Sequence, residues 1–299
     1  MEWKWAKANE KDLARFVNEK AIQLLDKLPV EDRLKLLSKP SGRRKVVEAI
    51  YQTLAKKGIR YDIEKYQPEA ETQHIRTPVE ILNTPGEGTC LDLAILFCSL
   101  CFGYDLLPLL ILIEGHAFAA VSLTHSRHGF NDDEHKKGWD DFRRTVFDTT
   151  DLFQGEENLA KLQKLVKEES YIAVECTGFT RSQSLAIEGI PRQEGGISFE
   201  DAVVIGEKNL NNPNKPFKFA IDIAAAKYIW KIPTEEIPNF DKARERAKAV
   251  FNVNVNRQDG GEVIGVEAKK VNSGRDLEAN VNIKKADQAR VVGGSCEEL

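Results

Sequence analysis

The sequence lacks the basic excess that is typical of a protein dedicated to nucleic acid. Lysine and arginine total 43 against 47 acidic residues, so the formal net charge is −4. A nucleic-acid-binding surface must neutralise phosphates and is therefore usually rich in basic side chains. The charge balance argues against a nucleic-acid partner.

Cysteine is scarce and odd in number, which is not the pattern of a disulfide-stapled domain. The five cysteines are at positions 90, 98, 101, 176 and 296, and three of them lie in or beside apolar runs. The first 16 residues are charged throughout and contain no signal-peptide core. We therefore expect a reducing, cytoplasmic location.

No hydrophobic run is both long and uninterrupted. The most apolar stretch, residues 91–113, is long enough to raise the question of a membrane span. It is interrupted by Asp92, by Gly103-Tyr-Asp105 and by Pro108. We interpret it as a buried helix, a turn and a buried strand, and expect no membrane span.

The sequence also lacks a clear metal or cofactor motif. His125, His128 and His135 lie near three acidic residues at 132–134, but no cysteine pair accompanies them and the stretch is typical of a solvated loop. Gly260-Gly261 lies between alternating segments, which favours a turn over a phosphate-binding loop. We expect neither a metal nor a cofactor.

What is present indicates a soluble protein with a sizeable core and three parts. The chain has 299 residues, of which 41% are hydrophobic and 30% charged. Helical periodicity over residues 10–57 predicts a helical N-terminal segment, residues 1–41, that continues into a central domain, residues 42–241. Residues 242–299 form a tail of different composition.

The central domain predicts an α+β core. An almost wholly apolar helix up to residue 102 is followed by apolar strands at 106–113 and 114–123, and by another strand at 171–177. Further helices are expected at 159–168, 199–210 and 217–230. Strands that are hydrophobic on both faces beside a buried helix imply helices packed on a sheet.

The tail contains a repeated alternating pattern. Asn and Val alternate over residues 252–256, followed by Gly260-Gly-Glu-Val-Ile-Gly265. A weaker copy, Ala279-Asn-Val-Asn282 and then Val291-Val-Gly293, follows at an offset of about 26–28 residues. This period of two predicts a β-strand or hairpin repeat, which could serve a protein partner or self-association.

Cys90 stands where a reactive thiol is expected. It follows Gly86 and Gly88, and Thr89 with Asp92 has the form of a capping box, which places Cys90 at the first helical position. The positive end of the helix dipole favours a thiolate there, although the charge of Asp92 opposes this slightly. Cysteines 98 and 101, inside the apolar helix, are interpreted as core.

A histidine and a carboxylate follow in an order that suits thiol chemistry. His116 comes directly after the turn between two apolar strands, where contact with Cys90 is geometrically natural, and a histidine beside a cysteine gives a thiolate–imidazolium pair. A third group must then hold the imidazole. Glu175, inside an apolar strand, needs a partner if it is buried, and we prefer it to Asp148 for this role.

These motifs resemble the transglutaminase-like cysteine peptidase family, within the papain-like thiol hydrolases. The resemblance covers about residues 42–232 and is carried by Gly88-Thr-Cys-Leu-Asp92, Gly115-His-Ala-Phe118 and Val174-Glu-Cys-Thr177. It implies a helix that bears the nucleophile packed on an antiparallel sheet. The chain departs from the family in having Glu175 where an aspartate is usual, and in the long spacing from His116, which implies an inserted loop and helix.

The resemblance also implies an activity. Cys90 would be the nucleophile, His116 the base and Glu175 the orienting acid of a peptidase that acts on a protein or peptide substrate, in a regulated signalling or defence role in bacteria. Gln73 resembles an upstream glutamine that serves the oxyanion in some relatives. An acyltransferase, and a non-catalytic scaffold that works through its terminal segments, are the alternatives.

Overall fold

The protein has a mixed α+β fold, as the sequence predicts. The computed structural model describes residues 1–4, 7–25, 28–30, 32–62, 72–82, 86–127, 153–181, 196–248, 251–255, 258–264, 279–283 and 286–292. It divides into two compact units, Met1–Pro238 and Asn239–Leu299. The N-terminal helices belong to the first unit, and the second unit begins at Asn239.

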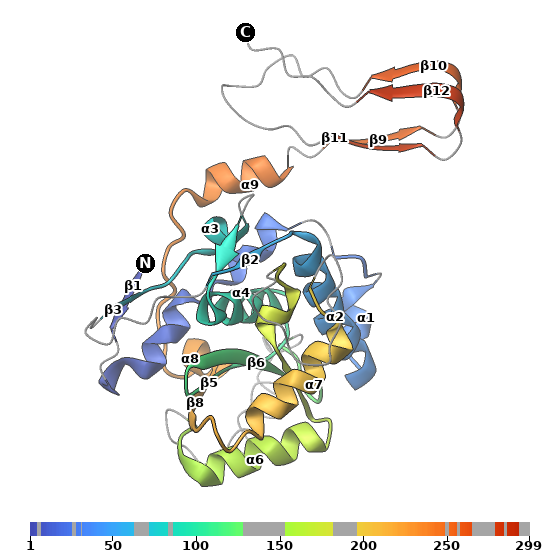
Figure 1. Ribbon diagram of the computed structural model, residues 1–299. Coiled ribbons are helices and arrows are strands. Elements are labelled where there is room, and N and C mark those ends of the chain that lie inside the picture. The colour runs from blue at the N-terminus through green and yellow to red at the C-terminus, as the bar shows by residue number, and fades with distance from the viewer. Residues whose placement is uncertain are drawn as a thin grey trace. The chain divides into compact units, whose positions relative to one another are not determined.

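A four-stranded antiparallel sheet forms the centre of the first unit (Figure 1). Its strand order is β7 (Tyr171–Val174), β6 (His116–Ser122), β5 (Pro108–Ile113) and β8 (Phe217–Asp222). The first pairing after the β5–β6 turn is Ile113 with His116. Gly115 in this turn has φ +68°, a left-handed conformation that favours glycine.

The expected helix over residues 217–230 is wrong in its first half. Residues 217–222 form the edge strand β8, and α8 (Ile223–Tyr228) begins only after it. Asp222 explains the change, because its Oδ1 accepts a hydrogen bond from the Ala225 amide at 2.9 Å and so caps the helix. Strand and helix follow one another without an intervening loop.

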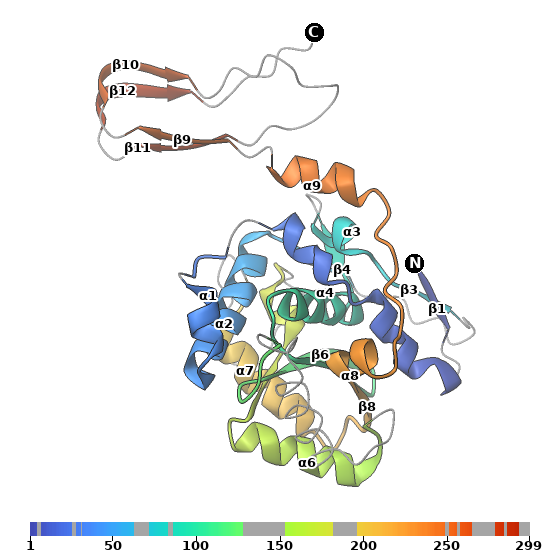
Figure 2. The same cartoon turned by 180° about the vertical axis from the view of Figure 1, so that it is seen from behind.

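The sheet is covered on both faces. Alternate strand residues, among them Leu110, Ala119 and Ile221, pack with α4 (Cys90–Gly103) in one hydrophobic cluster. The residues between them, such as Ile111 and Ala120, pack with α6 (Gly155–Lys167) in a second cluster. Figures 1 and 2 show α4 and α6 on opposite sides of the sheet. Every residue of α4 from Leu91 to Phe102 is buried.

The remaining elements of the first unit surround α4 and the sheet. The Asn18 amide donates a hydrogen bond to Ser99 Oγ at 3.0 Å, which fixes the N-terminal segment to α4. These elements are β1 (Glu2–Lys4), η1 (Lys7–Phe16), η2 (Glu19–Leu24), α1 (Arg33–Leu37), α2 (Pro40–Lys56), β2 (Arg60–Tyr61), β3 (Thr72–His74), α3 (Pro78–Leu82), β4 (Glu87–Gly88), η3 (Cys176–Phe179) and α7 (Phe199–Leu210).

The second unit contains α9 (Phe240–Lys248) and four strands. These are β9 (Phe251–Val255), β10 (Gln258–Ile264), β11 (Ala279–Ile283) and β12 (Ala286–Val292). In the described residues β9 and β10 do not pair with each other as a hairpin would. Instead β9 pairs with β11 and β10 with β12, both in parallel.

No helix in the described part of the chain combines the length and the apolar character needed to cross a bilayer.

Candidate active site

The first turn of α4 holds Cys90 in the predicted position. The Thr89 side chain accepts a hydrogen bond from the Asp92 amide, and the Asp92 carboxylate accepts one from the Thr89 amide, so the expected capping box is confirmed. Cys90 is the first helical residue and is partly exposed. Its backbone N–H, at the N-terminal end of α4, has no carbonyl acceptor within the helix.

The negative charge of Asp92 is compensated by Arg76. Asp92 is fully buried, and its two oxygens accept hydrogen bonds at 2.9 Å from the Arg76 amide and from Arg76 Nη1. Arg76 Nη2 also contacts Asp62 Oδ2 at 2.5 Å. The carboxylate that would oppose a thiolate at Cys90 is therefore neutralised by a guanidinium from the loop before α3.

His116 is the first residue of β6 and lies between Cys90 and Glu175. Its Nε2 is 2.6 Å from Glu175 Oε2, and its side chain also hydrogen-bonds to that of Cys90. Because Nε2 of His116 hydrogen-bonds to Glu175, Nδ1 is the ring nitrogen that remains to interact with the Cys90 thiol. The ring stacks on Phe118 at a centroid distance of 6.2 Å.

The surroundings of His116 favour its charged form. Burial lowers the pKa of the imidazole, but the charge of Glu175 and the hydrogen bonds to Cys90 and Glu175 outweigh burial and raise it to about 10. At neutral pH the ring is therefore an imidazolium, which stabilises a negative charge on the neighbouring sulfur.

Glu175 is buried and fully hydrogen-bonded. The strand predicted over residues 171–177 ends three residues early, at Val174, and Glu175 instead caps η3. Its Oε1 accepts hydrogen bonds from the Thr177 amide at 2.9 Å and from Thr177 Oγ1 at 2.7 Å. Its Oε2 accepts one from Asn209 Nδ2 at 2.7 Å in addition to that from His116.

These contacts keep the carboxylate ionised despite its burial. Burial alone would raise the pKa of Glu175, but the charge of His116 and the hydrogen bonds from His116 and Thr177 lower it below its ordinary value. A buried carboxylate that is ionised and fixed can hold the imidazole in one orientation and tautomer. Asn209, on α7, completes this arrangement, and the sequence gives no sign of that because α7 is remote in the chain.

Tyr61 is a further neighbour of Cys90 that sequence reasoning misses. It lies in β2, paired with Gly88 of β4, and its phenol hydrogen-bonds to the Cys90 side chain. Burial and the nearby negative charges of Cys90 and Glu175 raise the pKa of Tyr61 well above its ordinary value. The phenol therefore stays protonated and can donate a hydrogen bond to a thiolate.

The other described cysteines are buried thiols, as expected for core residues. Burial raises the pKa of Cys98, Cys101 and Cys176 far above the ordinary value, which makes them poor nucleophiles. Cys98 donates a hydrogen bond to the Leu109 carbonyl and Cys176 to that of Val174. Among the four, only Cys90 is partly exposed.

The remaining predicted site residues lie elsewhere. Gln73 is buried in β3, opposite Trp3 of β1. Asp148 falls outside the described residues, as do His128, His135 and the acidic residues 132–134. Within the described residues no group of three His, Cys, Asp or Glu side chains is arranged to hold a metal ion.

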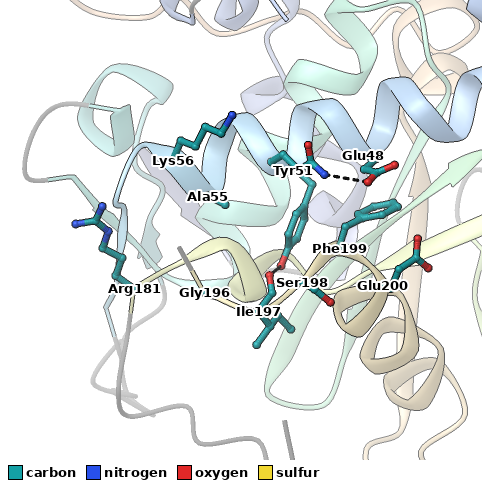
Figure 3. Close-up of a pocket in the computed structure, with 11 residues that line it drawn as sticks. Glu48, Tyr51, Ala55, Lys56, Arg181, Gly196, Ile197, Ser198, Phe199 and Glu200 are labelled. Atoms are coloured by element: carbon teal, nitrogen blue, oxygen red, sulfur yellow. Dashed lines mark hydrogen bonds between the residues drawn. The ribbon is translucent and has the colours of Figure 1, made fainter. Parts of the chain in front are cut away.

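A cavity of about 530 Å³ is present at a different place in the first unit (Figure 3). Its lining comes from α2, from Arg181 and from residues 196–200, and does not include Cys90, His116, Glu175 or Tyr61. Tyr51 points across it and donates a hydrogen bond to the Ile197 carbonyl at 3.1 Å. The arrangement of polar groups at Cys90 is thus separate from this hollow.

Comparison with known proteins leaves the family open. No family model matches the chain, no curated protein matches it, and no solved structure matches it.

Proposed function

We propose that the chain is a cysteine hydrolase of the transglutaminase-like, papain-type class, which cleaves a peptide or isopeptide bond through Cys90, His116 and Glu175. The observation that carries this function is the His116 ring, which hydrogen-bonds to the Cys90 thiol on one side and to the buried Glu175 carboxylate on the other. A nucleophile, a base and an orienting acid in this order are what thiol catalysis requires.

The placement of the three residues supports the papain-type core. Cys90 begins a buried helix, α4, which packs on an antiparallel sheet. His116 begins the strand β6, and Glu175 follows the neighbouring strand β7. The nucleophile thus comes from the helix, and its two supporting residues come from adjacent strands.

Acylation begins with the thiolate of Cys90 and the imidazolium of His116. The sulfur attacks the carbonyl carbon of the substrate, a C–S bond forms, and the π electrons of the carbonyl move onto its oxygen. The backbone N–H of Cys90, at the positive end of α4, donates to this oxyanion. When the C–N bond breaks, His116 gives its proton to the departing nitrogen, which leaves as an amine, and a thioester remains on Cys90.

Deacylation returns the site to its starting state. A water molecule loses a proton to His116 as its oxygen attacks the thioester carbon, and the C–S bond then breaks. The acid product leaves, and Cys90 is again a thiolate beside an imidazolium. If an amine took the place of water, the product would be a new amide and the chain an acyltransferase, so mass analysis of the products separates the two activities.

Covalent labelling tests the proposed function. A peptidyl fluoromethylketone should alkylate Cys90 with loss of fluoride, and peptide mass mapping should find the adduct there and not on Cys98 or Cys101. Cys98→Ser is the matched control and should label like the wild type, whereas Cys90→Ser should not label. Absence of labelling at Cys90, or equal labelling of the buried cysteines, would favour the non-catalytic scaffold.

The cellular setting is part of the same proposal. Cys90, Cys98, Cys101 and Cys176 are all free thiols, which suits the reducing conditions of the cytoplasm. A thiol nucleophile remains active only where it is not oxidised. We therefore place the protein in the cytoplasm, with a protein or peptide as substrate.

A further inference from the structure

The four described strands of the second unit pair as two copies of one sequence repeat. Phe251 pairs with Ala279 and Val255 with Ile283, and in the other sheet Gln258 pairs with Ala286. The offset between partners is the same 28 residues in both sheets. Both pairings are parallel, so the strands of the first repeat pair in register with the equivalent strands of the second repeat. We call each repeat one rung of the stack.

The register places like residues above like residues in the β9–β11 pair. Asn252 lies opposite Asn280, and Asn254 opposite Asn282. The positions between them form aliphatic pairs, of which Val253 with Val281 is one. Columns of asparagine and columns of aliphatic residues are both stabilising when parallel strands stack in register.

The β10–β12 pair adds a pair of opposite charges. Glu262 lies opposite Arg290, while Val263 lies opposite Val291. Asp259 lies opposite Asp287, which is the one like-charge pair in this register. A further rung in the same register would set Arg290 opposite the next Glu262, so the charges along this column would continue to alternate in sign.

The four described strands form two rungs, and no other described strand pairs with their outer edges. Each of these strands has a single partner among the described strands, so both outer edges of each sheet carry unpaired backbone groups. No proline follows Pro238 in the sequence, so the residue that most often blocks an edge is missing. Repeat structures generally need three or more units for stability, because two bury too little surface.

We propose that the strands β9, β10, β11 and β12 are an assembly surface for a second copy of this chain. The first repeat of one copy, β9 and β10, lies on the second repeat of its neighbour, β11 and β12, in parallel and with the register seen within the chain. This contact is heterologous and leaves the same surfaces open at both ends, so it continues into a linear stack. The partner is another copy because only the repeat sequence itself supplies the matching asparagine, aliphatic and Glu–Arg columns.

A charge swap in the full-length protein tests the register. In Arg290→Glu, the column formed by positions 262 and 290 contains only glutamates, so a favourable charge pair becomes a repulsive one both within and between copies. The protein concentration at which light scattering detects assembly should therefore rise about tenfold. The double variant Glu262→Arg/Arg290→Glu restores alternating charges and should return the threshold to the wild-type value. Protection of the buried Cys98 and Cys101 from iodoacetamide serves as the check that the first unit is folded in all three proteins.

Electron microscopy of the assemblies tests the number of rungs that each copy contributes. Neighbouring strands lie about 4.8 Å apart, so a copy with two rungs should advance the stack by roughly 9.5 Å. One copy per strand spacing, or no linear assembly at any concentration, would overturn the proposal. Equal assembly of the wild type and Arg290→Glu would also overturn it, as would failure of the swapped variant to recover.

Discussion

Two cysteines on the same helix show how differently one residue type can behave. Cys90 begins α4, is partly exposed and contacts the side chains of His116 and Tyr61. Cys98, two turns later, is fully buried, and its thiol donates to the Leu109 carbonyl at 3.7 Å. The helix is common to both, so the chemical difference comes from what other elements bring to each sulfur.

The groups around Cys90 come from separate parts of the first unit. His116 lies on β6, Tyr61 on β2, and Arg76 precedes α3. His116 acts on the Cys90 sulfur through an ion pair, Tyr61 through a hydrogen bond, and Arg76 by compensating the nearby charge of Asp92. Removing them one at a time should make Cys90 behave progressively more like an ordinary thiol, and the alkylation rate of Cys90 at pH 6 measures the change.

Replacement of His116 should have the largest effect. In His116→Ala the positive charge beside the sulfur is lost, and with it the stabilisation of the nucleophilic thiolate. The alkylation rate should therefore fall on the order of 100-fold, and the proposed hydrolysis should become undetectable. Phe118→Leu, which removes only the ring stacked on the imidazole, is the matched control and should keep most of the reactivity.

Glu175→Gln should have the next largest effect, on the order of tenfold at pH 6. Without the carboxylate charge, the pKa of His116 should fall well below 10, because the Cys90 side chain alone then opposes the effect of burial. Nitrogen-detected NMR of the imidazole measures this pKa directly. A value that stays near 10 would show that Glu175 does not control the ring.

The same variant should change the pH dependence of stability. The raised pKa of His116 stabilises the fold fully below its ordinary value of 6.5, and this contribution is lost as the pH rises through about 10. The lowered pKa of Glu175 stabilises the fold above its ordinary value of 4.5 and loses this effect in acid. The difference in melting temperature between wild type and Glu175→Gln should thus be largest between about pH 4.5 and 6.5 and shrink toward pH 10.

Arg76→Gln should lower the alkylation rate about fivefold, because the charge of Asp92 then opposes the thiolate without compensation. It should also destabilise the first unit by about 2–3 kcal/mol, since Asp92 is fully buried. Adding Asp92→Asn should recover both properties, as no unpaired charge remains. Asp62→Asn, which removes the more exposed partner of Arg76, should change neither by much.

Tyr61→Phe should have the smallest effect, about threefold, because water can replace one hydrogen bond at a partly exposed sulfur. The rate of iodoacetamide labelling at pH 6 would detect a change of this size. An unchanged rate would show that the phenol does not stabilise the thiolate.

Much of the framework around the site follows from local sequence. The capping box at Thr89 and Asp92 is a short-range pattern, and the apolar runs on either side of Gly115 predict the β5–β6 pair. Both features depend on residues that are close in the chain, so single-sequence reasoning reaches them.

The supporting residues could not be predicted in the same way. Arg76, Tyr61 and Asn209 reach the site from elements whose positions are set by tertiary packing, and no local pattern marks them. The strand β8 is different, because the sequence does contain a pattern that indicates it. Apolar and polar residues alternate at Phe217-Lys-Phe219, and Asp222 is a good helix cap. The apolar continuation into α8 conceals the junction between the two elements.

The pH dependence of Cys90 alkylation in the wild-type protein tests the central claim most directly. Because the positive charge of His116 that stabilises a negative sulfur is present throughout this range, the rate measured by mass spectrometry should change little between pH 6 and pH 8. A rate that instead rises about tenfold per pH unit over this range, as for an isolated thiol, would contradict the pairing of Cys90 with His116.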